Sequence, residues 1–121
     1  MNFRPTQFEL PTENPATLAQ FYVELFQWDI SHTPIAEFDY WRCKTGSGSG
    51  IDGAITKPMY PGQPLTNYVT VNDIVNVIRQ GEALGAKVRI PKSAVPGVGW
   101  FAILIDPAGH CLGLWQHDSS A

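Results

Sequence analysis

Residues 14–28 read NPATLAQFYVELFQW, and they carry the clearest helix signal in the chain. Asn14 can cap the free N–H groups of a first helical turn, and Pro15 suits the first helical position, where no N–H is needed. The segment Phe8-Glu9-Leu10 alternates with period two just before it, which predicts a half-buried strand. An apolar stripe at helical spacing follows the cap: Leu18, Phe21, Tyr22, Leu25 and Phe26.

The same pattern returns in the second half of the chain. Tyr68–Val71 reads as a strand, Asn72 or Asp73 as a helix cap, and Gly85 as a helix stop. A second apolar stripe lies between them: Ile74, Val77, Ile78 and Leu84. A constant offset of 59 residues relates the two halves, matching Gln7 with Thr66, Asn14 with Asp73 and Leu25 with Leu84. The pattern therefore predicts an internal duplication.

Three strand-like runs follow each predicted helix. They are Trp28–Thr33, Phe38–Lys44 and Ile51–Thr56 in the first half, and Ala86–Ile90, Trp100–Ile105 and Cys111–Gln116 in the second. Gly46–Gly50 and Asp106–Gly109 provide turns, and the Pro-rich stretch 58–65 provides a linker. We therefore expect one domain over 1–121, with a module at about 5–57, a linker at about 58–65 and a module at about 66–117.

Composition excludes several classes of partner. The net charge is −3 and the eight basic residues are scattered, so no surface for nucleic-acid phosphates is expected. The N-terminus has no apolar stretch of the signal-peptide kind, and no segment is long and apolar enough to span a membrane. Cys43 and Cys111 are too few to define a disulfide framework, and two reduced thiols in a cytoplasmic protein is the preferred interpretation.

In each of these two modules, both faces of the sheet must be covered. One helix covers one face of a four-stranded sheet, so the other face needs a partner sheet or a ligand. Two such open faces can curve into a cup. The order and spacing of several motifs then point to one family: Asn14-Pro15, Phe21-Tyr22, Leu25–Trp28, Asp106-Pro107-Ala108-Gly109-His110 and Leu114-Trp115-Gln116.

With these motifs the chain resembles the glyoxalase/bleomycin resistance/dioxygenase (vicinal oxygen chelate) superfamily. The resemblance implies an α+β fold in which two βαβββ modules form a curved mixed sheet around a cup. It also implies a homodimer, since members of the superfamily often dimerise. Glutathione-handling members carry an Arg where this chain has Pro11, which argues against a lactoylglutathione lyase.

Metal-dependent members hold a divalent ion with donors from the first and last strands of each module. By resemblance, these positions fall on Gln7, on or beside Gly53, on Thr66 and on Gly113. Only Gln7 matches a family ligand, so we expect no metal and no other cofactor. Asp52 leaves one alternative open, because a slip of one residue would place its carboxylate near the first glycine.

The same alternation predicts which side chains would line the cup. They are Gln7, Glu9, Thr66, Tyr68, Thr70, Cys111 and Trp115, with the two glycines opening space in its floor. Glu9 is the candidate general base, since burial raises a carboxylate's pKa, and Tyr68 could donate to an oxyanion. The alternative, which we favour, is that Glu9 pairs with Arg42 or meets solvent at the rim of the cup.

Three functions follow from these expectations. The first is a protein that binds a small, partly apolar ligand in the cup without the family metal. The second is a metal-independent lyase or isomerase that uses Glu9 as its base. The third is a metal-dependent glyoxalase or dioxygenase, against which Gly53 and Gly113 argue. Whether the chain is an enzyme stays open at this point, because function depends on sites and not on the fold.

Overall fold

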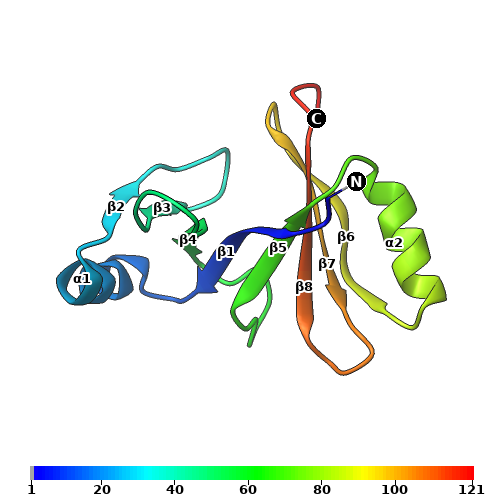
Figure 1. Cartoon of the computed structure of the whole chain (residues 1–121), viewed down its shortest axis with the longest axis horizontal. Helices are drawn as coiled ribbons and strands as arrows, with labels where there is room; N and C mark the ends of the chain where they lie inside the picture. Colours follow the sequence, from blue (N-terminus) through cyan, green and yellow to red (C-terminus); the bar gives the residue numbers. More distant parts are fainter. Residues whose placement is uncertain (1) are drawn as a thin grey trace. The chain divides into compact units, whose positions relative to one another are not determined.

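The computed structural model describes residues 2–121, which form eight strands and two helices in a mixed α+β fold (Figure 1). The elements are β1 (Pro5–Pro11), α1 (Pro15–Phe26), β2 (Asp29–His32), β3 (Trp41–Lys44), β4 (Asp52–Thr56), β5 (Thr66–Thr70), α2 (Ile74–Ala83), β6 (Lys87–Val95), β7 (Gly99–Ile105) and β8 (Cys111–His117). Two compact units result: Gln7–Thr66, and the residues up to Thr6 together with Asn67–Ala121. The predicted fold class and the order of elements are confirmed.

The Gln7–Thr66 unit contains four strands in the order β2-β3-β4-β1, with α1 beside them (Figure 1). β1 runs parallel to β4, and the other two pairs are antiparallel. Its core consists of Ala19, Cys43 and Ile55, with aromatic and aliphatic side chains packed against them. These residues come from α1, β3 and β4, so the helix and the sheet share one apolar layer.

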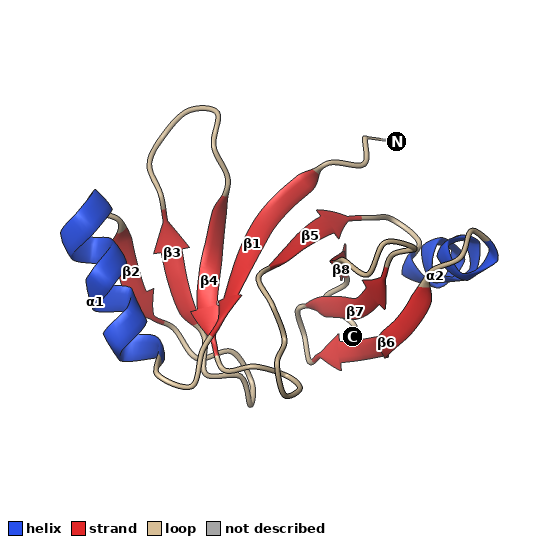
Figure 2. Cartoon of the chain, turned by 90° about the horizontal axis from the view of Figure 1, so that it is seen from below, coloured by secondary structure: helices blue, strands red, loops and turns tan. Residues whose placement is uncertain are grey.

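The other unit repeats this arrangement with the strand order β5-β8-β7-β6 (Figure 2). β5 and β8 are parallel, whereas β7 is antiparallel to both of its neighbours. The core under α2 consists of Val71, Ile74, Ala102, Leu104 and Leu114. Both units are therefore a helix packed on one face of a four-stranded sheet, as the duplicated sequence pattern predicts.

The two helices begin at the predicted, equivalent residues, but only one cap works as expected. Asp73 precedes α2 and accepts a hydrogen bond from the Asn76 N–H at 3.1 Å, which satisfies one donor of the first turn. Asn14 precedes α1, yet its side chain makes no capping hydrogen bond. Its own N–H donates to the Thr12 hydroxyl instead, at 3.1 Å. The predicted capping role of Asn14 is therefore wrong, although the position is right.

The buried face of α1 is also shifted from the predicted stripe. Leu18 and Tyr22 pack on the core, together with the buried Ala19, whereas Phe21, Leu25 and Phe26 are more than half exposed. Leu84 of the second predicted stripe is 81% exposed, because α2 ends one residue before it. The sequence predicts the helices correctly. Which residues of each helix face the sheet depends on packing, which the spacing of apolar residues does not define.

The end of β6 differs from the end that the sequence predicts, because pairing with another strand determines it. β6 continues to Val95 past Pro91, with register shifts on both sides of Ile90. The sequence predicts an end at Ile90, since proline cannot donate to a ladder. β6 is the last strand in its order, and proline is tolerated on an edge strand. Within residues 2–121, neither helix has the length and apolar character needed to cross a membrane.

Candidate functional site

One face of the Gln7–Thr66 sheet carries no helix. Phe8 and Leu10 of β1 pack into the core under α1, so the alternating residues Gln7 and Glu9 lie on the opposite face. The register extends this face across the sheet: Gln7 pairs with Asp52, Glu9 with Ala54, Ala54 with Arg42, and Arg42 with Ser31. We call this surface the Glu9 face, and it comprises Gln7, Glu9, Ser31, Tyr40, Arg42, Lys44, Asp52 and Ala54.

Tyr40 directly precedes β3, and its carbonyl accepts from the Thr33 N–H at 2.8 Å, so the extended pairing with the β2 side continues to it. It lies two residues before Arg42, and we therefore count it in the Glu9 face. Burial raises the pKa of its phenol above the ordinary value, and the negative charge of Glu9 raises it further, while Arg42 lowers it. Tyr40 therefore stays a neutral hydrogen-bond donor next to a carboxylate and a guanidinium. Sequence reasoning missed this residue, although its period-two relation to Arg42 was a usable signal.

The family metal positions can now be placed in each unit separately. The register pairs Glu9 with Ala54 in one unit and Tyr68 with Gly113 in the other, which preserves the offset of 59 residues on both strands. The equivalent of Gly113 is therefore Ala54. Gly53 pairs with Phe8 on the α1 face, so of the positions on or beside Gly53 it is the neighbour that lies on the helix-free face. Its neighbour Ala54 offers no donor either.

The remaining positions fit a metal ion poorly. Thr66 is fully buried, and its hydroxyl donates to the Pro64 carbonyl at 2.9 Å. Asp52 does lie beside Gln7, as the open alternative required, but its carboxylate accepts from both the N–H and the hydroxyl of Thr45. Residues 2–121 contain no group of three or more His, Cys, Asp or Glu side chains suited to an ion. These donors do not match a family-type site.

The two glycines do not open space, contrary to expectation. A Cβ on Gly113 would lie 2.5–2.7 Å from the ring of Tyr68, and one on Gly53 would lie 2.6 Å from the ring of Phe8. An aromatic ring therefore covers each glycine. Tyr68 is 3% exposed, and Thr70, Cys111 and Trp115 follow the same alternation on the helix-free face of their unit. The predicted ligand-binding role of these residues stays a prediction.

The cysteines and tryptophans have structural roles in the described residues. Burial raises the pKa of the Cys43 thiol to about 11, so this side chain is not a thiolate at neutral pH. The ring of Trp115 lies against Gly99, and its indole N–H donates to His117 Nδ1 at 3.2 Å. No disulfide joins Cys43 and Cys111. Thiol catalysis therefore has no support from Cys43.

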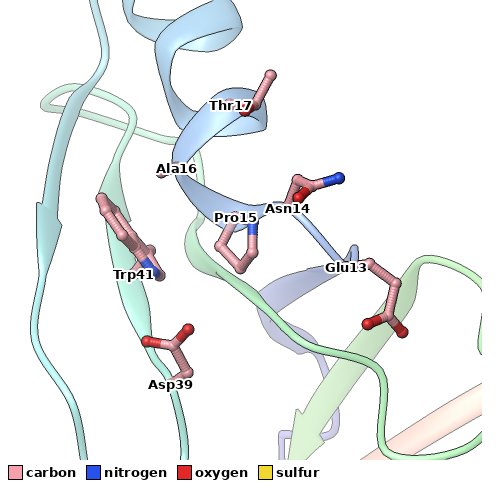
Figure 3. Close-up of a pocket in the computed structure, with 7 residues that line it drawn as sticks. All are labelled: Glu13, Asn14, Pro15, Ala16, Thr17, Asp39 and Trp41. Carbon is pink, nitrogen blue, oxygen red and sulfur yellow. The ribbon is translucent and has the colours of Figure 1, made fainter.

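A small pocket lies on the other side of the same unit, where α1 begins next to β3 (Figure 3). It measures about 180 Å³ and is lined by Glu13, Asn14, Pro15, Ala16, Thr17, Asp39 and Trp41. The carboxylate of Asp39 is held by His32 Nε2 at 2.6 Å, and the His32 ring stacks on Trp41. The pocket is smaller than typical ligand pockets of about 300–1,000 Å³, and it lies away from the Glu9 face.

Two βαβββ units, each with a helix on one face and a polar or aromatic helix-free face, define a protein of the paired βαβββ class. Comparison with solved structures agrees. Methylmalonyl-CoA epimerase of Streptomyces coelicolor, in complex with 2-nitronate-propionyl-CoA, matches with a TM-score of 0.70 at 14% identity, over 94% of this chain and 96% of that one. The epimerase of Mycobacterium tuberculosis matches with a TM-score of 0.65 at 10% identity, over 96% and 87%. These likenesses show the fold.

Sequence comparison gives relatives of the same kind. The Mycobacterium tuberculosis protein named "Putative glyoxylase CFP32" is 27% identical over 119 residues, which cover 93% of this chain and 45% of the relative. "Anthracycline biosynthesis protein DnrV" of Streptomyces peucetius is 26% identical over 129 residues, covering 93% and 46%. No family model matches. The chain is thus similar in sequence to a protein named as a glyoxylase, in agreement with the predicted resemblance to the glyoxalase/bleomycin resistance/dioxygenase superfamily. It spans about half the length of the curated relatives it matches.

Proposed function

We propose that the chain binds a small, partly apolar molecule at the Glu9 face and does so without the family metal ion. The observation that supports this proposal is the β1–β4 register, which pairs Glu9 with Ala54, a residue without a donor beside the expected metal position at Gly53. Glu9, Tyr40 and Arg42 supply instead a carboxylate, a neutral phenol and a guanidinium within one surface. A few such polar groups are sufficient to orient a small ligand.

The relatives support small-molecule chemistry in general terms. Their names refer to a glyoxylase and to anthracycline biosynthesis, and the epimerase structures hold coenzyme A compounds. We do not extend any of these ligands to this chain, because identities of 10–27% leave the site residues free to differ. The cytoplasmic location and the homodimer are part of the same proposal. The first rests on the interpretation of the two cysteines as reduced thiols, and the second rests on the family resemblance.

The test combines metal analysis with ligand screening. Protein purified without chelators is expected to contain far less than one equivalent of any transition metal by elemental analysis. Nickel, zinc, manganese and iron are expected to leave the melting temperature unchanged, because an ion that binds only the folded state would raise it. A small-molecule library is expected to yield compounds that do raise it. One stoichiometric ion, with stabilisation by that ion, would overturn the metal-free part of the proposal.

A second candidate function is proton transfer by Glu9 without a metal, in a lyase or isomerase. The register favours it, because it places Glu9 on the same face as Arg42 and Tyr40, and the negative charge of Glu9 raises the pKa of the Tyr40 phenol. Such a pair could remove a proton from a carbon next to a carbonyl group and donate to the oxygen that gains charge.

This second candidate is tested by solvent deuterium exchange into carbonyl compounds that bind the protein. The wild-type chain is expected to catalyse exchange, and Glu9→Gln is expected to lose it while binding the same compound, since an amide cannot accept the proton. Asp52→Asn is the matched control, because it neutralises a carboxylate on the same face that already has hydrogen-bond partners. Equal exchange by wild type and Glu9→Gln excludes Glu9 as the base.

A further inference from the structure

Arg42 is a cation of the Glu9 face whose direct neighbours on the adjacent strands are uncharged. Its side chain is exposed, and in residues 2–121 it makes no hydrogen bond or ion pair. The register surrounds it with uncharged neighbours, Ser31 on β2 and Ala54 on β4. The expected Glu9–Arg42 ion pair is therefore absent from the structure, and the guanidinium remains available to a ligand.

Lys44 provides the contrast on the same strand and face. It is also exposed, but it pairs in register with Asp29 of β2. Opposite charges directly across two strands attract each other, so Asp29 gives Lys44 an anionic neighbour within the sheet. Of the two cations that β3 presents on this face, Arg42 alone has no anion opposite it.

The surroundings of Arg42 indicate what else the ligand would meet. Tyr40 directly precedes β3 and lies two residues from Arg42, so the extended chain turns both toward the same face. The Cα atom of Glu9 is two strand spacings, about 10 Å, from that of Arg42. An arginine side chain spans most of such a distance. A small molecule whose anionic end lies on the guanidinium would therefore have its other end within reach of Tyr40 and Glu9.

We infer that the ligand of the Glu9 face is a small organic acid whose carboxylate is bound by Arg42. The guanidinium fits a carboxylate with two parallel hydrogen bonds, which a lysine ammonium cannot provide. The uncharged part of the acid then lies toward Tyr40 and Glu9, and a carbonyl or hydroxyl group there can accept from the phenol. This inference rests on the proposed small-molecule function, and it defines the chemical class of the ligand.

The experiment uses pairs of compounds that differ only in charge. Amide chemical shifts of the labelled full chain are followed during titration with 2-oxobutyrate and 2-oxobutanamide, and with benzoate and benzamide. The two acids are expected to shift the backbone N–H signals of β1, β3 and β4 more strongly than the corresponding carboxamide compounds do. Arg42→Gln is expected to weaken binding of the acids on the order of 10-fold, the value for losing a charge-assisted contact in a partly exposed site, while binding of the amides is unchanged. Lys44→Gln is the matched control and is expected to have an effect of less than about 2-fold.

The outcomes separate the inference from the proposed function. If acids and amides bind equally well at the Glu9 face, or if both variants weaken the acids to the same extent, the inference is wrong and small-molecule binding stands. If neither the acids nor the neutral compounds shift the backbone N–H signals of β1, β3 and β4, and the library screen is also negative, the proposed function fails and the inference fails with it. Added salt provides a further check, because binding through an exposed guanidinium is expected to weaken as ionic strength rises.

Discussion

Gly53→Ala is expected to lower the free energy of unfolding by about 3 kcal/mol, near the upper end of the usual cost of overpacking. The new methyl group would meet the carbonyl oxygen of Phe8 on the paired strand and lie 2.6 Å from the Phe8 ring. A ring can turn away, but the carbonyl belongs to the β1 backbone that pairs with β4. Relief therefore requires β1 to move away from β4, which breaks the pairing of these two strands.

The matched control is Gly50→Ala, three residues earlier. Its Cβ would meet nothing nearer than the Thr45 hydroxyl at 4.0 Å, and its backbone is not left-handed. This change is expected to leave the stability unchanged or to raise it by up to about 1 kcal/mol, because alanine restricts the unfolded chain. Urea denaturation of both variants measures the difference. A Gly53→Ala variant as stable as Gly50→Ala would contradict the close β1–β4 pairing.

Leu104→Ala is expected to cost about 3 kcal/mol in the other unit. Leu104 is 1% exposed and belongs to the core with Val71, Ile74 and Leu114 under α2. Removing its buried methyl groups loses both the transfer free energy and the contacts around the resulting cavity.

The same Leu→Ala substitution at Leu84 is the control, because it removes the same atoms from an exposed position. Leu84 is 81% exposed, so Leu84→Ala is expected to change the stability by less than about 0.5 kcal/mol. Thermal unfolding followed by circular dichroism compares the two variants. Similar losses in both would contradict the end of α2 at Ala83 and would return Leu84 to the buried stripe that the sequence predicts.

Local signals were sufficient for the elements and their order. Pro15, Asp73 and the Asp106–Gly109 turn act within a few residues, and the structure has helices and a hairpin where they predict them. The alternation of β1 also gave the correct faces, since Phe8 and Leu10 enter the core. These features depend on short-range geometry that a sequence contains directly.

What the sequence left undecided depends on pairing between distant segments. The position equivalent to Gly113 is Ala54 and not Gly53, because the register of β4 against β1 sets it over a separation of about 45 residues. A shift of one residue exchanges the two faces of a strand, so a position known only as on or beside Gly53 leaves its face undecided. The neutral neighbours of Arg42 and the approach of Tyr40 to Glu9 follow from the same register.

The strands at the two ends of the sheet order have a consequence for self-association. β6 carries Lys87, Arg89, Pro91 and Lys92 along an irregular ladder, and β2 has only four residues. Short, charged or proline-containing edges discourage another chain from adding a strand, which is the route to edge-to-edge aggregation. Two copies of this chain are therefore expected to associate through side-chain surfaces, without a backbone ladder that runs from one copy into the next.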